Sequence, residues 1–311
     1  MDQVMANPLA GPRATVHRVA IVTDSASDVS VQEAQALGAT VLPATIYFGA
    51  RTFRDGLDLS PEQFFQALGQ TPDLPRTQPP DAASFFDAYM RLLEGGATAI
   101  LSIHTSKELS GAISSAREAA RQVSRQIGAP APIVTLDSRQ AATALLPAVR
   151  FAAQMAQVGA PIEAIAAAVQ GRLTRIRMYV LVETLEYLQR GGRIGRAQRL
   201  LGTLLDAKPI ITIQDGVVAP VETARPRERA YERLLELVGS LGALEELYVG
   251  QTSEALGQEM VERLSRVYQG PIHRRWIGAG VGVNMGKGVA IAAVLADRSR
   301  GYYLTQEPES R

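Results

Sequence analysis

The hydrophobic residues of this chain form short continuous runs, and amphipathic stretches separate one run from the next. Residues 18–23 are largely apolar and β-branched, which predicts a buried strand. Ser30 is followed three residues later by Glu33, a capping box, so we expect a helix that ends at Gly38. Further strands are predicted at 39–48, 97–103 and 133–136, and further helices at 62–68, 81–93, 112–127 and beyond Ser138. This order predicts a mainly parallel sheet covered by helices on both faces.

The pattern changes beyond Gly159, where strands and helices no longer alternate regularly. Apolar runs at 210–213 and 217–221 flank Asp215 and Gly216, a pair typical of a tight β-hairpin. Other helices are predicted at 161–171, 189–201, 227–238 and 254–268, and other strands at 178–182, 247–249 and 273–277. We therefore expect an α/β protein with two α/β domains. The first, 17–160, has a mainly parallel sheet, the second, 161–303, has a mixed sheet with helices, and residues 1–15 form a loose leader.

Composition excludes several classes of function. The 32 Lys and Arg residues nearly balance the 31 Asp and Glu residues, so no long-range field attracts the chain to nucleic acid or to an anionic membrane. Cysteine is absent, and the three histidines have no i, i+4 spacing, so we expect no disulfide and no metal site. The longest apolar run, 289–296, is too short for a membrane span. We expect a cytoplasmic protein without stable membrane insertion and without a nucleic acid partner.

Polar residues follow the first predicted strand at 23–28 and include Asp24 and Ser25. Ligands of open α/β sheets bind at the carboxyl ends of strands, which makes this segment a candidate site. The same residues are also typical of a simple turn, in which Asp24 caps the backbone.

A second candidate is Leu109, Ser110 and Gly111, directly before the helix predicted from residue 112. The unpaired N–H groups of a helix start favour a carboxylate or phosphate, and Gly111 allows close approach to the backbone. Ser110 is equally suited to the role of an ordinary N-cap.

Two further segments are less specific. Residues 75–79 combine prolines with Arg76 and Thr77, and alone they favour an irregular surface loop. Arginines recur every third residue from Arg190 through Arg193 and Arg196 to Arg199, a spacing that gathers them on one side of a helix. Such a surface suits phosphate or an acidic partner, and it also suits a solvated basic face.

A glycine-rich segment, 278–288, lies near the C-terminus and includes Asn284. No βαβ unit follows it, and Lys287 is not followed by Ser or Thr, so it is neither a dinucleotide fingerprint nor a P-loop. We expect the backbone here to approach a ligand or another strand closely. No Gly-x-Ser-x-Gly elbow occurs in the chain, and the spacing of His104 and Ser110 does not support a hydrolase triad.

Taken in order, these motifs resemble the DegV family, bacterial fatty-acid-binding proteins that serve as the lipid-carrying subunit of fatty acid kinase. The resemblance extends from residue 17 to about residue 300. Its most specific parts are VTDSASD at 22–28, LSG at 109–111 and ETLEYLQRGGRI at 183–194, which continues into LGTLLDAKPI at 201–210.

The resemblance implies a long acyl chain in a buried slot between the two domains, with its carboxylate bound by hydroxyl groups. The family's Thr-Ser-Gln-Pro motif corresponds to residues 76–79 and its Leu-Ser-Gly motif to 109–111, so the expected carboxylate ligands are Thr77 and Ser110. The expected ligand is a long-chain fatty acid such as palmitate. The resemblance also implies that the chain has no catalytic residue and no cofactor, and that it presents the carboxylate to a partner kinase for acyl phosphate formation.

Other residues receive roles from the same resemblance. Asp24, Ser25, Gly111 and Asn284 are further head-group or site-shaping candidates, and Arg190, Arg193 and Arg196 are candidates for docking the kinase. Two positions depart from the family pattern. The family has two adjacent hydroxyl residues before Gln78, whereas this chain has Arg76 and Thr77 and therefore only one hydroxyl. Asn284 stands where the family often has histidine.

Two other functions fit some of these features. Ser110 at a helix start and the clustered arginines also suit an enzyme that acts on a small phosphorylated substrate. A regulatory module that binds nucleic acid through the arginines is disfavoured, because the net charge is +1 and no aromatic stacking platform is evident.

Overall fold

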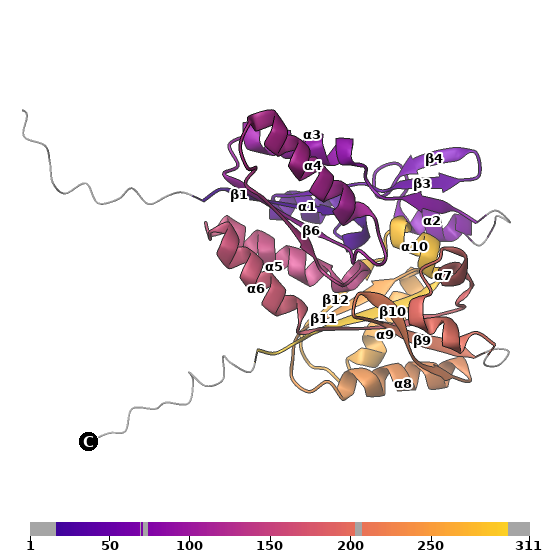
Figure 1. Ribbon diagram of the computed structural model, residues 1–311. Coiled ribbons are helices and arrows are strands. Elements are labelled where there is room, and N and C mark those ends of the chain that lie inside the picture. The colour runs from indigo at the N-terminus through magenta and orange to yellow at the C-terminus, as the bar shows by residue number, and fades with distance from the viewer. Residues whose placement is uncertain (1–16, 69, 71–73, 203–206, 298–311) are drawn as a thin grey trace, which may run out of the picture.

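The computed structural model describes residues 17–68, 70, 74–202 and 207–297, which fold into two layered halves (Figure 1). The first half is built on a parallel sheet and the second on a mixed sheet, so the predicted α/β fold class is confirmed. The predicted leader, 1–15, and the end of the second predicted domain, 298–303, lie outside the described residues. None of the helices in the described ranges is both long and apolar enough to cross a membrane.

The parallel sheet of the first half has the strand order β2-β1-β6-β7. Its strands are β1 (Val19–Asp24), β2 (Ala39–Leu42), β6 (Ala99–His104) and β7 (Ile133–Asp137). Helices α3 (Ala82–Glu94) and α4 (Ala112–Ile127) cover one face, and α1 (Val31–Leu37), α5 (Leu146–Gln157) and α6 (Ile162–Leu173) lie on the other. Successive residues of β1 alternate between the two faces: Ile21 packs with α5, and Val22 packs with α3 and α4. Helices therefore cover both faces, as predicted.

Local signals set the ends of the first helix. The Ser30 hydroxyl accepts a hydrogen bond from the backbone N–H of Glu33 at 3.2 Å, and Gly38 ends α1 with φ +64°. Helix α2 (Pro61–Leu68) begins with a proline at its first position, where no N–H is needed.

The strand predicted at 39–48 is in fact two strands of two different sheets. The chain leaves the parallel sheet after β2 at Pro43, which has no N–H to donate, and continues as β3 (Thr45–Phe48). Strand β3 is the centre of a three-stranded antiparallel sheet with β4 (Arg51–Arg54) and β5 (Arg76–Gln78). The prediction of an irregular loop at 75–79 is therefore wrong for its central three residues, because Thr77 pairs with Ile46 in this sheet.

The mixed sheet of the second half has the strand order β10-β9-β8-β13-β11-β12. Its strands are β8 (Ile176–Val182), β9 (Lys208–Gln214), β10 (Val217–Ala224), β11 (Leu244–Gln251), β12 (Ile272–Trp276) and β13 (Gly288–Leu295). Asp215 and Gly216 join β9 and β10 with φ of +56° and +82°, which confirms the predicted hairpin. Helices α8 (Arg227–Gly239) and α9 (Glu254–Leu264) pack on one face of the sheet. The other face is turned toward the first half.

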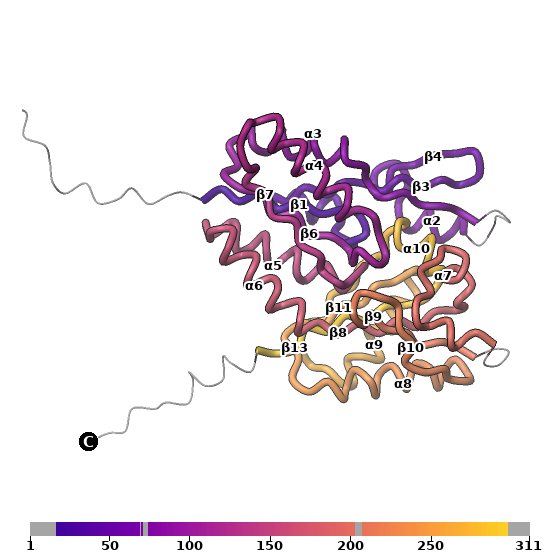
Figure 2. The backbone as a smooth tube through the Cα atoms, viewed as in Figure 1, coloured from indigo at the N-terminus to yellow at the C-terminus, as the bar shows by residue number. Residues whose placement is uncertain are grey.

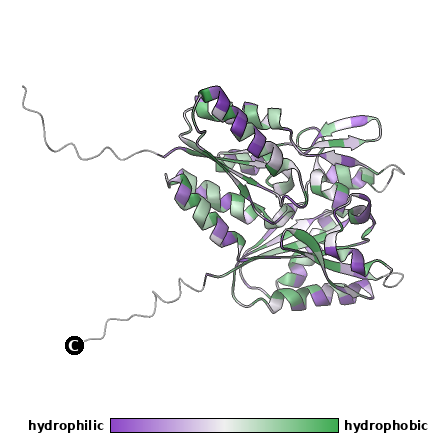
Figure 3. Cartoon of the chain, viewed as in Figure 1, coloured by the Kyte–Doolittle hydropathy of each residue, from purple (hydrophilic) through white to green (hydrophobic). Residues whose placement is uncertain are grey.

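Hydropathy follows this layering (Figure 3). The strands of both sheets are largely hydrophobic, whereas α4 and α8 carry hydrophilic residues along much of their length. One hydrophobic cluster joins side chains of both sheets, including Leu101 of β6 and Val180 of β8. The two halves therefore share a core.

The C-terminal part of the chain returns to the first half before its last strand (Figure 2). The glycine-rich segment forms a short helix, α10 (Ala279–Met285), which packs against α2, β3 and β5. A Cβ atom on Gly282 would lie 2.6 Å from the Phe64 ring, so the expected close approach is one between α10 and α2. Helix α6, which follows the expected boundary at residue 160, packs against β6 and β7 of the parallel sheet.

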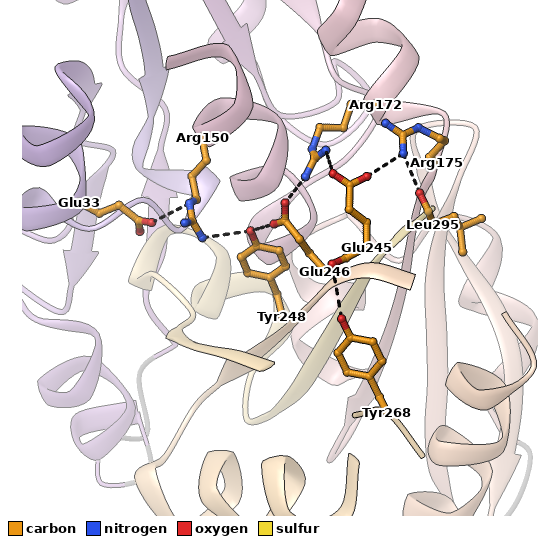
Figure 4. Close-up of polar contacts among 9 residues, drawn as sticks. All are labelled: Glu33, Arg150, Arg172, Arg175, Glu245, Glu246, Tyr248, Tyr268 and Leu295. Carbon is orange, nitrogen blue, oxygen red and sulfur yellow. Dashed lines mark hydrogen bonds and ion pairs between the residues drawn. The ribbon is translucent and has the colours of Figure 1, made fainter. Parts of the chain in front are cut away.

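A cluster of polar contacts also joins the halves at the start of β11 (Figure 4). We call it the ion-pair clasp and define it as Arg150, Arg172, Arg175, Glu245, Glu246 and Tyr248. Arg172 of α6 contacts Glu246 and lies 2.9 Å from Glu245, and Arg175 lies 3.0 Å from the other oxygen of Glu245. Arg150 of α5 donates a hydrogen bond to the Tyr248 hydroxyl at 3.1 Å.

Candidate functional site

A cavity lies between the two halves, where a slot was expected, and its empty volume is about 950 Å³, part of which is open to solvent. The inner face of the mixed sheet supplies most of its apolar wall. The apolar lining residues on this sheet are Met178, Val180, Ile211, Ile213, Val218 and Ala290. The opposite wall comes from the first half, at the carboxyl ends of β1 and β6 and at β5. This is the edge of a parallel sheet at which ligands bind in open α/β folds.

Polar residues from four separate segments meet in the lining of this cavity. Asp24 ends β1, Thr77 lies in β5, Ser110 precedes α4 and Asn284 lies on α10. More than 200 residues of chain separate the first of them from the last. The structure thus brings four of the predicted site residues together.

Strand β5 determines which of its side chains reaches the cavity. Arg76 and Gln78 are exposed, and Thr77 between them is half-buried and lines the cavity. Arg76 lies over the ring of Tyr47, outside the cavity. The departure from the family pattern at Arg76 therefore lies outside the cavity lining.

Ser110 lies directly before the start of α4, as the sequence predicted. Its hydroxyl oxygen accepts a hydrogen bond from the backbone N–H of Ala112 at 3.2 Å, which leaves the hydroxyl proton free to be donated. A Cβ atom on Gly111 would lie 3.6 Å from Pro79, so the loop that carries Ser110 contacts the end of the strand that carries Thr77. Gly111 is not part of the cavity lining, and its role in shaping the site stays a prediction.

Asn284 packs against the turn that contains Gly191. A Cβ atom on Gly191 would lie 2.1 Å from Asn284 Oδ1, so only glycine leaves room for this amide. Arg193 also lines the cavity, with Nε donating to the Leu109 carbonyl at 3.3 Å and Nη1 donating to the Gly191 carbonyl. Arg193 is therefore tied to the cavity wall.

The prediction of one helix carrying the arginines is wrong. Helix α7 (Glu186–Arg190) ends at Gly191, and a separate 3-10 helix, η3 (Gly195–Leu200), follows. Arg190 lies 2.8 Å from Glu186, and Arg196 lies 3.3 Å from Asp215. Both are exposed, unlike Arg193. The kinase-docking role of these residues stays a prediction.

Asp24 begins a chain of buried hydrogen bonds behind the cavity. Its Oδ1 accepts from the backbone N–H of Ala26 at 3.1 Å, and its Oδ2 lies 2.8 Å from Nδ1 of His104. Ser102 Oγ lies 2.7 Å from Nε2 of the same ring and accepts from the Tyr89 hydroxyl at 2.7 Å. Asp24 therefore both caps its turn and lines the cavity, and the ring of His104 is bound to Ser102 and Asp24 rather than to Ser110.

Ser25 lies behind the cavity wall and helps to anchor α10. Its hydroxyl accepts from the backbone N–H of Ala44 at 3.0 Å and hydrogen-bonds to Asp55. Asp55 in turn accepts from the N–H groups of Ala279 and Gly280 at 3.0 and 2.9 Å. Asp55 was missed by the sequence analysis, because nothing near residue 55 indicates a partner more than 200 residues away.

Asp28 provides a second anchor for α10. It accepts from the N–H of Gly278 at 3.0 Å and from the Thr143 hydroxyl at 2.8 Å. Burial raises the pKa of Asp28 to about 7, against an ordinary value of 3.8, and the neighbouring carboxylate of Asp55 adds to the rise. Burial also raises the pKa of Asp55. Together the two carboxyl groups fix the start of the helix that carries Asn284.

Comparisons with known proteins agree with this architecture. A family model described as "uncharacterised protein, DegV family" matches residues 18–296. A DegV domain-containing protein of Streptomyces coelicolor is 32% identical over 291 residues, which are 90% of this chain and 99% of that protein.

Two solved structures are similar over nearly the whole chain. A DegV family protein of Thermus thermophilus, described by its fatty acid binding, is 29% identical with a TM-score of 0.78, covering 89% of this chain and 100% of that one. DegV of Bacillus subtilis, described as a fatty acid binding protein, is 26% identical with a TM-score of 0.80, covering 90% of this chain and 100% of that one.

Proposed function

The chain belongs to the DegV family, and from this premise we propose that it binds a long-chain fatty acid in the cavity between its two halves. The observation that carries the proposal is the cavity itself, which combines an apolar wall on the mixed sheet with hydroxyl and amide groups from the first half and α10. The fatty acid binding described for the Thermus and Bacillus proteins supports the same ligand class.

The apolar wall supplies most of the affinity in this proposal. Burial of about 14 methylene groups at ~0.8 kcal/mol each offers roughly 11 kcal/mol before the costs of ordering and association. One hydrogen bond to the head group contributes about 0.5 to 3 kcal/mol. The tail therefore determines how tightly the ligand binds, and the polar groups determine its orientation.

Thr77 and Ser110 are the proposed carboxylate ligands, since both hydroxyls line the cavity and the Ser110 proton is available to donate. Asn284 adds an amide that donates without taking up a proton, where related chains often have histidine. Arg193 lines the same cavity, and its positive charge would favour a carboxylate bound there.

The proposal extends to a carrier role in the cytoplasm. The chain performs no chemistry of its own and presents the carboxylate to a partner kinase, which forms the acyl phosphate. Arg190 and Arg196 are exposed beside the cavity wall and are the arginines best placed to contact that kinase. This part of the proposal is supported by the family resemblance alone.

Mass spectrometry and ligand titration test the proposal. We expect organic extraction of purified protein to release a long-chain fatty acid, and we expect palmitate to raise the melting temperature of the extracted, refolded protein. Small phosphate esters should leave the melting temperature unchanged. A shift with phosphate esters and none with palmitate would instead favour an enzyme that acts on a phosphorylated substrate.

A further inference from the structure

Thr105 is the first residue after β6 and lines the cavity, yet the sequence analysis gave it no role. Its side chain is only 3% exposed. Within the part of the chain that the structure describes, its hydroxyl Oγ1 has no hydrogen-bond partner. A buried hydroxyl without a partner costs folding free energy, so it requires an explanation.

The direction of the side chain follows from the alternation along β6. Ser102 and His104 face α3, where the His104 ring meets Phe85 at 5.0 Å. Ile103 faces the opposite side, in the cluster shared by both sheets. Thr105 continues the side of Ile103, toward the second half and the cavity.

Several of the other polar residues that line the cavity already have hydrogen-bond partners. Both oxygens of Asp24 have partners, in Ala26 and His104, and Ser110 accepts from Ala112. Of the remaining polar residues in the lining, Thr77, Asn284 and Arg193 belong to the proposed head-group site, and the Thr212 hydroxyl donates to the Met178 carbonyl at 2.6 Å. The Thr105 hydroxyl has one unused proton and one unused oxygen directed at the space that a ligand would fill.

We propose that Thr105 is a third hydroxyl ligand of the carboxylate, donating its proton to a carboxylate oxygen beside Thr77 and Ser110. The assignment rests on the proposed fatty acid binding and adds a specificity-determining residue to it. A carboxylate supplies the partner that the folded chain lacks, whereas an acyl tail does not. The hydroxyl is therefore unfavourable for folding and favourable for ligand binding.

Loss of the Thr105 hydroxyl should therefore weaken ligand binding without lowering the stability of the ligand-free protein. Loss of a hydroxyl with a purely structural role would lower stability instead. Thr105→Val keeps the shape of the side chain and removes the hydroxyl. We expect palmitate to bind the valine variant about tenfold more weakly, and we expect the ligand-free variant to melt at the same or a higher temperature. Thr105→Ser retains the hydroxyl and should restore palmitate affinity to within about threefold of the original chain.

Thr23→Val is the matched control. Thr23 is fully buried in β1, its hydroxyl also has no partner among the described residues, and it is not part of the cavity lining. We expect this variant to bind palmitate with unchanged affinity. A weakening equal to that of Thr105→Val would show that hydroxyl loss acts through the fold, and it would overturn the assignment.

The remaining outcomes separate the assignment from the proposed function. If the original chain binds palmitate and Thr105→Val binds it equally well, the assignment alone is wrong. A lower melting temperature for ligand-free Thr105→Val would mean that the hydroxyl already has a partner, which also overturns the assignment. If the original chain does not bind palmitate, the proposed function fails and the assignment fails with it.

Discussion

The ion-pair clasp and the cavity join the same two halves of the molecule in opposite ways. In the clasp, Arg172 is 3% exposed and contacts the carboxylates of Glu245 and Glu246, which are 36% and 27% exposed, so a buried charge is paired with carboxylates that water still reaches. In the cavity, the facing surfaces are mainly apolar, and the Thr105 hydroxyl is buried without a partner among the described residues. The terminal nitrogens of Arg172 thus have carboxylate partners, and only its Nε has none within the ranges that the structure describes, whereas the cavity leaves a buried hydroxyl available to a ligand.

The two regions also differ in their dependence on pH. Burial alone would raise the pKa of Glu245, but hydrogen bonds from Arg172 and Arg175 lower it below its ordinary value. Stability from this group is therefore present above its unfolded pKa and is lost as the pH falls through the lower folded value. Asp28, beside the cavity, has a raised pKa and the opposite dependence. Acid therefore weakens the clasp, whereas a rise in pH weakens the anchor that Asp28 provides for α10.

The largest effect is expected from breaking the clasp. Arg172→Ala removes the hydrogen bonds that this buried guanidinium group donates to Glu245 and Glu246, each worth about 1.5–2 kcal/mol, and its packing over Phe151, so the expected loss is about 3–4 kcal/mol. Urea denaturation measures the loss. Arg229→Ala is the control, because Arg229 forms exposed pairs within α8 and its loss should cost less than about 1 kcal/mol. Equal losses in the two variants would contradict the special role of the clasp.

The pH dependence around α10 should come next in size. Because the folded protein binds the Asp28 proton more tightly than the unfolded chain does, the free energy of unfolding should fall as the pH rises from about 4 to 7 and then level off. Asp28→Asn keeps an oxygen for the Gly278 N–H and removes the charge, and it should reduce this fall by on the order of 2–4 kcal/mol. Asp55 retains part of the slope, since burial raises its pKa as well.

Denaturation curves of both proteins at several pH values between 5 and 8 measure this difference. The range lies above the acid region in which the clasp loses stability. Identical slopes for Asp28→Asn and the original chain would show that Asp28 is not the titrating group.

Ligand affinity should respond to the cavity hydroxyls and not to hydroxyls nearby. We expect Ser110→Ala and Thr77→Val each to weaken palmitate binding by roughly three- to tenfold, the loss of one hydrogen bond to a carboxylate, while tail burial maintains binding. Isothermal titration calorimetry measures the dissociation constants. Ser114→Ala, an exposed serine on the first turn of α4, is the control and should bind normally. Unchanged affinity in both cavity variants would remove these hydroxyls from the site.

The smallest effect on lipid binding is expected outside the cavity. Arg190→Glu reverses an exposed charge and breaks the pair with Glu186, so palmitate affinity should stay within about twofold of the original value. Arg193→Glu should weaken palmitate binding clearly, because Arg193 lines the cavity. If the two substitutions had the same effect on affinity, the distinction between the two arginines would be wrong.

The sequence predicted best what local signals determine. The ends of α1, the whole of α4 and the β9–β10 hairpin follow from caps, glycines and turn residues within a few positions. Strand β5 escaped prediction because its partner β3 lies about 30 residues earlier and because prolines flank it. Helix α10 is rich in glycine, a poor helix former, and its start is fixed by Asp55 from a distant part of the chain.

The candidate site shows the same division. Position and residue type drew attention to Asp24 and Ser110, since they follow buried strands or precede a helix. Thr77 and Asn284 gained roles only through the family resemblance, because their meeting in one cavity depends on long-range packing. Thr105 gave no signal in the sequence, since only the folded chain shows that its hydroxyl is buried and has no partner in the part of the chain that the structure describes.

A crystal structure of the protein with bound palmitate tests the central claim most directly. The account predicts the acyl chain between the halves, against the inner face of the mixed sheet, with the carboxylate within hydrogen-bond distance of Thr77 and Ser110. Palmitate on an outer surface, or in the cavity with its carboxylate away from both hydroxyls, would contradict the account.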